Sequence, residues 1–221
     1  MKTLLYAFSL LMPWSLRRIY LQAVFKFELH PTSRIGLAWI LPRKLVMGKH
    51  SSIGNFTVCK HIDLVELGAY ATLGRGNWIT GFPSGPWRPF SHDRDRRPEL
   101  ILGEHTAITN RHFIDCTSRV RLGAFTTFAG YQSQILTHAV SIERSRQESA
   151  PVEIGDYCFI GTNCVLLGGS LLPSYSVLGA KSLLNKKFNE SYTLYGGTPA
   201  KAVKKLDQKS LYFSRELGAV D

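Results

Sequence analysis

Acidic residues are scarce in this sequence, and the shortage lies at its two ends. The 221 residues hold 27 Lys and Arg against 16 Asp and Glu, a net charge of +11. Residues 1–60 contain nine basic residues and one acidic residue, a net charge of +8. Residues 61–180 contain ten basic and eleven acidic residues, a net charge of −1. Residues 181–221 contain eight basic and four acidic residues, a net charge of +4. Nucleic-acid-binding proteins more often spread Lys and Arg along a recognition surface. Basic ends around a neutral middle instead favour an anionic membrane, an anionic cofactor or an acidic polymer, so we expect no nucleic-acid partner.

Cysteines are few, and the N-terminal apolar run is short. The four cysteines include no CxxC pair and no histidine at zinc-ligand spacing, which argues against a disulfide framework and a structural metal site; they are Cys59, Cys116, Cys158 and Cys164. We expect reduced thiols in a cytoplasmic protein without a metal. Residues 3–12 (TLLYAFSLLM) are too few to span a bilayer, and Pro13 and Trp14 follow them where a signal peptide would have small residues.

Residues 14–28 have the periodicity of an amphipathic helix. Apolar residues recur there at steps of three and four: Leu16, Ile19, Tyr20, Ala23, Val24 and Phe27. An exposed stripe of this size would be a liability, so something must cover it. We expect either packing on the protein or its oligomer, or peripheral binding to a membrane with Arg17, Arg18 and Lys26 facing anionic lipid.

A six-residue period replaces the helical one from residue 47 onward. Weaker copies of the hexad pattern start at residues 47, 67, 102 and 122. Two extra residues interrupt the period between 59 and 67 and again between 114 and 122, and we call these interruptions two-residue slips. Each hexad must be one short extended segment plus a bend, because the period fits neither an α-helix nor a strand with two alternating faces. The pattern therefore predicts a β-solenoid. It is clearest where a large aliphatic residue recurs, with a small residue four positions after each of the first five: Ile154, Ile160, Leu166, Leu172, Leu178 and Leu184.

The hexads and the closing run YGGTPAKAVKKL resemble the hexapeptide-repeat acyltransferases, in particular galactoside, maltose and surface-polysaccharide O-acetyltransferases. The resemblance covers residues 47–206 and implies an all-β, left-handed parallel β-helix. At three hexads per coil, about six coils would rise roughly 29 Å, with ~4.8 Å between strands. We expect residues 1–34 to form the N-terminal helical segment, residues 35–206 the β-helix, and residues 207–221 a tail with a short helix. The family also implies a homotrimer.

Two segments break the repeat and are expected to be loops. Residues 81–99 are rich in proline, glycine and arginine and cannot form a buried coil. Residues 139–151 are polar and directly follow His138. Loops that leave a rigid scaffold commonly carry function.

His138 ends the phrase SQILTH, just before the second loop. A sugar hydroxyl is a poor nucleophile until its proton is removed, and imidazole titrates near neutral pH. In the sugar and antibiotic O-acetyltransferases that this stretch resembles, a histidine before such a loop, followed by I-G-x-x-x-x-I-G, is the general base. The resemblance therefore implies that His138 is catalytic.

Asn110, His112 and Asp115, in the phrase TNRHFIDC, are candidates for the acceptor site. In the similar galactoside acetyltransferases the stretch that aligns with Asn110 to His112 touches the acceptor, although those enzymes lack this histidine. His112 occupies the small-residue position of its hexad, where an imidazole is too large to be filler. Asp115 could orient a histidine or form a ladder with neighbouring coils, and a structural role is an equal alternative for all three.

The resemblance also implies a site for acetyl-CoA as co-substrate, along the outside of the solenoid between two subunits. By position, Thr162 and Ala180 fall at pantetheine contacts. Lys201 and Lys204 fall where the family commonly has arginine near the nucleotide phosphates, and lysine keeps the charge without the bidentate fork. Ordinary coil structure and a solvated basic face are the alternatives.

Together these features predict an acetyl-CoA-dependent O-acetyltransferase that modifies a saccharide hydroxyl in surface polysaccharide biosynthesis, at the inner face of the cell membrane. A gamma-type carbonic anhydrase resembles this fold but needs two histidines separated by four residues. Here His105 and His112 are seven apart and His138 is twenty-six further on. A non-enzymatic β-helical scaffold is the other alternative, and coenzyme A binding would distinguish it.

Overall fold

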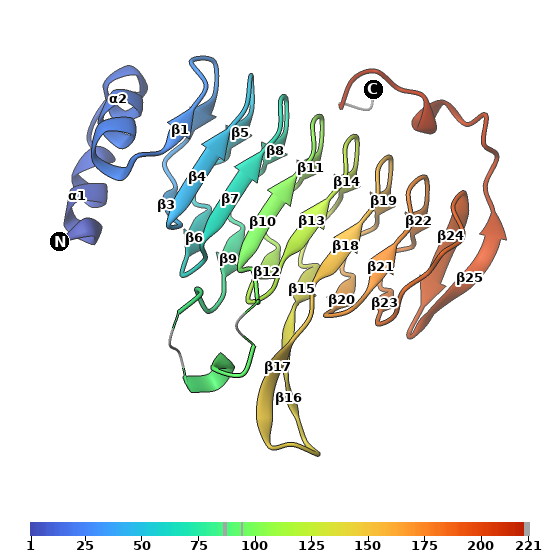
Figure 1. Ribbon diagram of the computed structural model, residues 1–221. Helices are drawn as coiled ribbons and strands as arrows, with labels where there is room; N and C mark the ends of the chain where they lie inside the picture. The colour runs from blue at the N-terminus through green and yellow to red at the C-terminus, as the bar shows by residue number, and fades with distance from the viewer. Residues whose placement is uncertain (86–87, 94, 219–221) are drawn as a thin grey trace.

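The computed structural model describes residues 1–85, 88–93 and 95–218. It shows three stacks of short parallel strands wound around one axis, with two helices at the N-terminal end (Figure 1). Residues 86, 87 and 94 of the expected loop 81–99, and residues 219–221 of the expected tail, lie outside the described residues.

Three sheets form the sides of the solenoid. Sheet A consists of β1 (Glu28–Leu29), β4 (Lys44–Met47), β7 (Leu64–Leu67), β10 (Glu99–Leu102), β13 (Val120–Leu122), β18 (Val152–Ile154) and β21 (Leu171–Leu172). Sheet B consists of β2 (Arg34–Ile35), β5 (Ser52–Ile53), β8 (Thr72–Leu73), β11 (Ala107–Ile108), β14 (Thr127–Phe128), β19 (Phe159–Ile160) and β22 (Val177–Leu178), followed by β24 (Thr193–Gly197) and β25 (Ala200–Lys205). Sheet C consists of β3 (Trp39–Leu41), β6 (Val58–Lys60), β9 (Trp78–Thr80), β12 (Phe113–Asp115), β15 (Gln134–Leu136), β20 (Val165–Leu167) and β23 (Leu183–Leu184).

The chain visits sheets A, B and C in turn, and each such circuit is one coil of a left-handed parallel β-helix, as expected. Across the described residues there are seven coils, one more than the sequence predicted. The additional coil, β1 to β3, precedes residue 47. Its buried residues Leu29, Ile35 and Ile40 are spaced by six and then by five, which hides the period.

The large residue of each hexad fills the interior, as the pattern predicts. All six aliphatic residues from Ile154 to Leu184 are at most 1% exposed, and the small residues that follow them are buried too. The four cysteines are free and buried, so they behave as small core residues.

Two helices, α1 (Lys2–Ser9) and α2 (Trp14–Phe25), cover the open end of the first coil. Arg17 is 2% exposed, and its guanidinium donates to the carbonyls of Gly36 (2.7 Å) and Ala38 (3.2 Å) and to the Tyr6 hydroxyl (3.1 Å). An end coil has carbonyl groups with no further strand to bind, and Arg17 satisfies two of them. The prediction that Arg17 faces lipid is therefore wrong.

The apolar stripe expected to be covered is largely exposed. α2 turns Arg17 and Leu21 toward the coils, whereas Leu16 and Ile19 are 58% and 59% exposed. Phe27 lies beyond the end of the helix and is buried. The structure also extends the apolar surface to α1, and among the described residues no helix has the length and hydropathy to cross a membrane.

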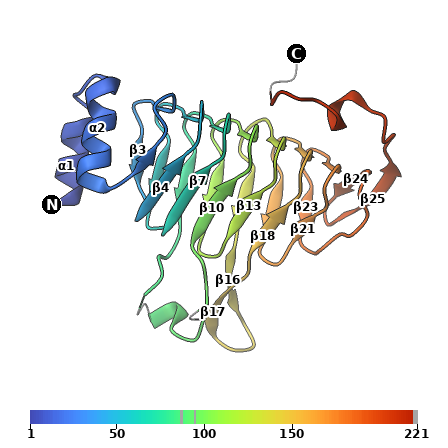
Figure 2. The same cartoon turned by 45° about the horizontal axis from the view of Figure 1, so that its top comes forward.

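The closing run forms an antiparallel hairpin, β24 and β25, at the other end of the solenoid. Up to residue 218 the tail contains a single 3₁₀ turn, η2 (Leu211–Phe213), in place of the expected short helix. This turn lies along a column of stacked rings at the corner between sheets A and B, and Figure 2 shows the tail returning over the last coils. The column, one ring per coil, is His50, Tyr70, His105, Phe125, Tyr157, Tyr175 and Tyr192.

Candidate functional site

The chain makes its longest turns at one corner of the solenoid, between sheet C and sheet A, which we call the C–A corner. The two-residue slips fall here, and so do both segments that break the repeat, after β9 and after β15. Parallel strands place these turns in neighbouring coils, since Ile114 of β12 pairs with Ile79 of β9 and Ile135 of β15. Segments far apart in the sequence therefore meet at this corner.

His138 and Asp115 lie in contact at the C–A corner. The Nδ1 atom of His138 is 2.7 Å from Oδ2 of Asp115. Asp115 ends β12, and His138 follows β15 in the next coil. The Asp115 side chain is 3% exposed, whereas that of His138 is 30% exposed, so a buried carboxylate holds an imidazole that solutes can reach.

Asp115 is held as an anion by neighbouring donors. Its Oδ1 accepts hydrogen bonds from the backbone N–H (3.1 Å) and hydroxyl (2.6 Å) of Thr117, and its Oδ2 accepts from those of Thr137 (2.8 and 2.9 Å). Burial by itself would raise the pKa of Asp115, but the hydrogen bonds from His138, Thr117 and Thr137 outweigh it and hold that pKa below its ordinary value. Of the two readings of Asp115, the geometry matches the one in which it orients a histidine.

The same contact sets the tautomer and the basicity of His138. Because Nδ1–H donates to Asp115, the lone pair of the neutral ring is on Nε2, where it can accept a proton. The hydrogen bond to Asp115 raises the pKa of His138, while burial and the nearby Arg96 cation act in the opposite direction. The net pKa is raised, which makes the ring a stronger base than free imidazole.

Two phenylalanines and an arginine from the first loop surround His138. Phe82 and Phe90, the last residue of η1 (Arg88–Phe90), lie edge-to-face with the imidazole at 5.6 and 6.1 Å between ring centroids. The Arg96 guanidinium lies 4.5 Å from the Phe90 centroid and donates to the carbonyls of Phe82, Pro83 (3.2 Å) and Thr117 (2.7 Å). Arg96 is 7% exposed, so it anchors the loop against the corner that holds Asp115.

Replacing Arg96 by methionine should lower any activity that depends on His138 by ~10-fold, because the loop loses its anchor. The acid limb of the pH–rate profile should also move to higher pH, since removal of a nearby cation lets the pKa of His138 rise. The measurement is kcat/KM against pH. The exposed neighbour Arg97, replaced by methionine, is the matched control, and an unchanged limb in Arg96→Met would contradict the electrostatic effect of Arg96 on His138.

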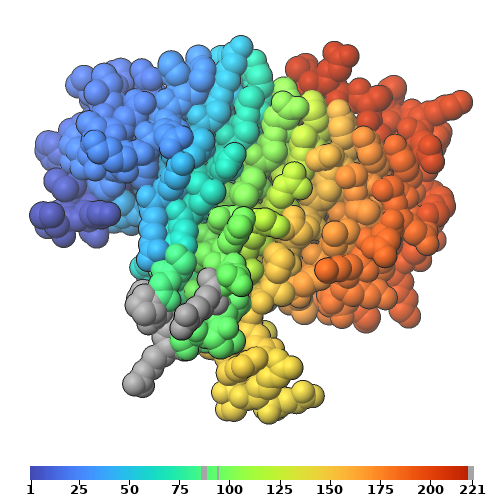
Figure 3. Space-filling model, viewed as in Figure 1, coloured from blue at the N-terminus to red at the C-terminus, as the bar shows by residue number. Residues whose placement is uncertain are grey.

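The second loop is a β-hairpin rather than an irregular segment. Strands β16 (His138–Ser141) and β17 (Arg146–Ser149) pair antiparallel, and the Ser149 hydroxyl lies 3.1 Å from Oδ2 of Asp93 in the first loop. Figure 3 shows the two segments projecting together from the stacked coils. The two loop segments therefore lie next to each other beside His138, the first residue of β16.

Asn110 and His112 lie on the other edge of sheet C, at the corner with sheet B (the B–C corner). The Asn110 Oδ1 accepts a hydrogen bond from the backbone N–H of Arg75, which links two coils. His112 Nδ1 accepts from the backbone N–H of Ser133 (3.2 Å), and its Nε2 lies 3.0 Å from the Thr109 hydroxyl. Burial lowers the pKa of His112 to about 4. The structure thus brings Asp115, and neither Asn110 nor His112, into contact with His138.

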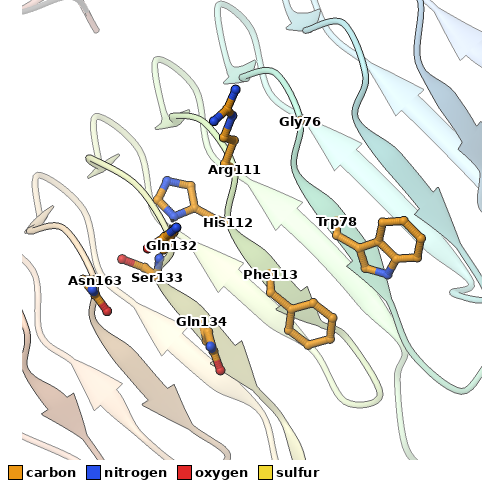
Figure 4. Close-up of a pocket in the computed structure, with 9 residues that line it drawn as sticks. All are labelled: Gly76, Trp78, Arg111, His112, Phe113, Gln132, Ser133, Gln134 and Asn163. Carbon is orange, nitrogen blue, oxygen red and sulfur yellow. Dashed lines mark hydrogen bonds between the residues drawn. The ribbon is translucent and has the colours of Figure 1, made fainter.

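A shallow pocket of about 410 Å³ lies over sheet C beside His112 (Figure 4). Trp78 and Phe113 line it from paired positions on β9 and β12 and are 44% and 37% exposed. Two exposed rings on one sheet face form an apolar surface that a further molecule could cover.

The predicted cofactor residues are also away from His138 within one chain. Thr162 and Ala180 are exposed at the B–C corner of consecutive coils, and the Thr162 carbonyl accepts from the backbone N–H of Lys181 (2.9 Å). Gly168 is six positions after Thr162, just beyond β20, and its N–H donates to the carbonyl of Leu136 at the end of β15, so a strand of sheet C separates Thr162 from the corner that holds His138. Lys201 and Lys204 are exposed on β25 at the end of the solenoid.

The three histidines considered for a metal site lie at three different corners. His105 stacks between Tyr70 and Phe125 at the corner of sheets A and B, whereas His112 and His138 lie at the other two. In the part of the chain that the structure describes, no group of three His, Cys, Asp or Glu side chains is placed to hold a metal ion.

Solved structures share this fold. A hexapeptide-repeat acetyltransferase of Vibrio cholerae O1 biovar eltor, complexed with acetyl coenzyme A, is 23% identical over 64% of this chain and 70% of that chain, with a TM-score of 0.52. A polysialic acid O-acetyltransferase is 19% identical over 86% and 90% (TM-score 0.62), and a galactoside acetyltransferase complexed with coenzyme A is 15% identical over 100% and 86% (TM-score 0.51). Neither a protein-family model nor a curated protein sequence matches the chain. The resemblance to hexapeptide-repeat acyltransferases is thus confirmed at the level of the fold.

Proposed function

We propose that this chain is an acetyl-CoA-dependent O-acetyltransferase whose acceptor is a saccharide hydroxyl. The observation that carries the proposal is the His138–Asp115 pair, an accessible imidazole oriented by a buried carboxylate with Nε2 free to accept a proton. The fold supports it, because solved structures with this architecture include acetyltransferases complexed with acetyl coenzyme A or coenzyme A.

The proposed reaction needs one base and no covalent enzyme intermediate. Nε2 of His138 removes the proton of the acceptor hydroxyl while the oxygen attacks the thioester carbonyl. Backbone N–H groups of the adjoining coil hold the developing oxyanion. The tetrahedral intermediate then collapses, the carbon–sulfur bond breaks, and the coenzyme A thiolate takes the proton from His138. The products are the acetyl ester and free coenzyme A, and Asp115 keeps the imidazolium oriented between the two transfers.

The direct test is coenzyme A release from acetyl-CoA against a panel of free, nucleotide-linked and lipid-linked sugars, with mass spectrometry of the products. An acetyl ester on a sugar supports the proposal. Thermal stabilisation by coenzyme A would distinguish the proposed enzyme from a non-enzymatic scaffold, because only a protein that binds coenzyme A in its folded state is stabilised by it. Turnover of acetyl-CoA onto an amine instead would place the chain among N-acyltransferases and refute the acceptor class.

A homotrimer with the cofactor between subunits is part of the proposal. Thr162 and Ala180 lie at the B–C corner, across sheet C from the C–A corner that holds His138, and this separation agrees with a pantetheine arm that serves the His138 of a neighbouring copy. The exposed rings of Trp78 and Phe113 on sheet C offer an apolar surface for that neighbour. Light scattering of the purified protein measures the oligomeric state.

We expect the double substitution Lys201→Ala and Lys204→Ala to weaken binding of coenzyme A more than binding of dephospho-coenzyme A. Point charges act most on the ligand with most charge, and added salt should reduce the difference. Calorimetric titration of both ligands measures it. Lys209→Ala, another exposed lysine, is the control, and equal losses for the two ligands would point to a different phosphate site.

We further propose that the two N-terminal helices bind an anionic membrane peripherally. Their exposed apolar residues lie beside Lys2, Arg18 and Lys26, and residues 1–27 contain no Asp or Glu. Basic residues near an anionic leaflet contribute about 1 kcal/mol each, in addition to apolar insertion. The most exposed apolar residues of the two helices and of the turn between them are Leu4, Phe8, Leu11, Leu16 and Ile19.

Replacing Leu4, Phe8 and Leu11 together by serine should abolish flotation with anionic vesicles. Surface substitution is a cleaner test than truncation, because Tyr6 and Arg17 are buried against the first coil and their loss would uncover it. Ile142→Ser, which removes an 87% exposed residue of the hairpin, is the control. Unchanged flotation of the triple variant would exclude the membrane role.

A further inference from the structure

The solenoid holds His138 at a fixed height above its N-terminal end. In sheet C, β3 belongs to the first coil and β15 to the coil that carries His138, and the order β3, β6, β9, β12, β15 separates them by four steps. At ~4.8 Å per step the height is ~19 Å. The helices at the end add a layer of ~10 Å.

The exposed side of the helix pair faces away from the coils. The buried Tyr6 of α1 contacts Trp39 of β3 at 5.4 Å between rings and donates to the Ala38 carbonyl, and α2 turns Arg17 toward the same coil. Figures 1 and 2 both show the two helices beyond the first coil, at the end of the solenoid axis. The apolar residues Leu4, Phe8 and Ile19 are therefore on the outer surface of that end.

A bilayer bound to this outer surface would meet the solenoid end-on. Interfacial helices sink ~5–10 Å into the headgroup region, so His138 would stand ~20 Å above the membrane surface. The stacked coils are rigid, and the contacts that hold the helices to the first coil are buried, so this height is built into the fold.

We infer that the acceptor is a glycan chain of several sugars anchored in the membrane, modified at a sugar remote from the lipid. A sugar attached directly to a lipid lies at the headgroups and cannot reach His138. A linked hexose extends a chain by roughly 5 Å, about four single bonds, so an acceptor needs about four sugars to present a hydroxyl at this height. The inference rests on the proposed acetyl transfer and on the proposed membrane binding, and names the acceptor class for that site.

Orientation can be measured without any enzymatic activity. Leu37, Tyr131 and Lys181 are exposed at the B–C corner of the first, fifth and seventh coils, and the native cysteines are buried, so single cysteines there can be labelled selectively. We expect energy transfer from a fluorophore to an acceptor lipid in anionic vesicles to fall in the order Leu37→Cys, Tyr131→Cys, Lys181→Cys. Equal transfer from the three positions would mean that the solenoid lies flat, and would overturn the inference.

Acceptor length is tested with lipid-linked glycans of one, two, four and eight sugars in anionic vesicles, and with the same glycans free in solution. We expect the free glycans to be acetylated at similar rates, and the vesicle-bound ones at least ~10-fold faster with four or more sugars than with one or two. Esters on the sugar next to the lipid, or equal rates at all lengths in vesicles, would overturn the inference. If no glycan is modified in either form, the proposed acetyl transfer fails and the acceptor assignment with it, while the energy-transfer series still reports the orientation.

Discussion

His138→Ala is expected to lower the rate of acetyl transfer by ~10² to 10⁴ while the protein still folds, because the substitution removes the general base and little packing. The His138 side chain is 30% exposed and belongs to a corner rather than to the interior of the solenoid. The measurement is kcat/KM with saturating acetyl-CoA, beside a thermal melt that reports the folded state.

His61→Ala is the matched control, since His61 is an exposed histidine at the same type of corner three coils away. It should keep the wild-type rate. If a folded His138→Ala protein retains more than about a third of the wild-type rate, the base is another group.

Asp115→Asn should lower the rate by ~10² and move the acid limb of the pH–rate profile to lower pH. In the wild type the limb reflects His138, whose pKa the Asp115 hydrogen bond raises, so the active free base is lost as pH falls through a value above that of free imidazole. The amide carries no charge and cannot raise that pKa. The base form of His138 therefore persists to lower pH in the variant, although its ring is no longer held in one tautomer.

Loss of stability is a competing explanation for Asp115→Asn and needs its own measurement. Six donors from Thr117, Thr137 and His138 converge on the carboxylate, and an amide NH₂ would leave some of them unpaired, at a cost of about 1–3 kcal/mol for each buried group. Urea unfolding measures that cost. In the His138→Ala background, Asp115→Asn should reduce the residual rate little further if Asp115 acts through His138, and an additive loss would contradict this role.

The solenoid could be predicted from the sequence because its core residues recur with the period of the coils. One aliphatic residue per hexad points inward, and that requirement repeats unchanged from Ile154 to Leu184. The first coil was missed because its spacing changes from six to five at Ile40, and the short C-terminal helix was wrong because the tail packs as a single turn on a ring column whose members lie in different coils.

The site was only partly predictable, for a related reason. His138 could be selected from its own segment, but the contact with Asp115 depends on the register of coils 23 residues apart. The two-residue slips mark the same corner in the second and fourth coils, so they place the end of the Asp115 strand at that corner but do not pair it with His138. Phe82, Phe90 and Arg96 gave no such signal, since a loop without a period has no register that places it over His138. The prediction that Arg17 faces lipid was wrong because a cation on a helix beside apolar residues commonly faces solvent or lipid. Here the carbonyls of the first coil bind it instead.

The returning tail changes how this solenoid should unfold. In a linear stack each coil contacts only its neighbours, so segments can open one after another from either end. Here the tail crosses four coils: Phe213 packs on Tyr175, the Tyr212 hydroxyl donates to the Cys158 carbonyl, Arg215 donates to the Phe125 carbonyl, and the Gly218 N–H donates to His105. Two of these are the coils that supply Asp115 and His138. Opening of the C-terminal half thus becomes one cooperative event, and hydrogen exchange at the C–A corner should report the integrity of a segment more than seventy residues further along the chain.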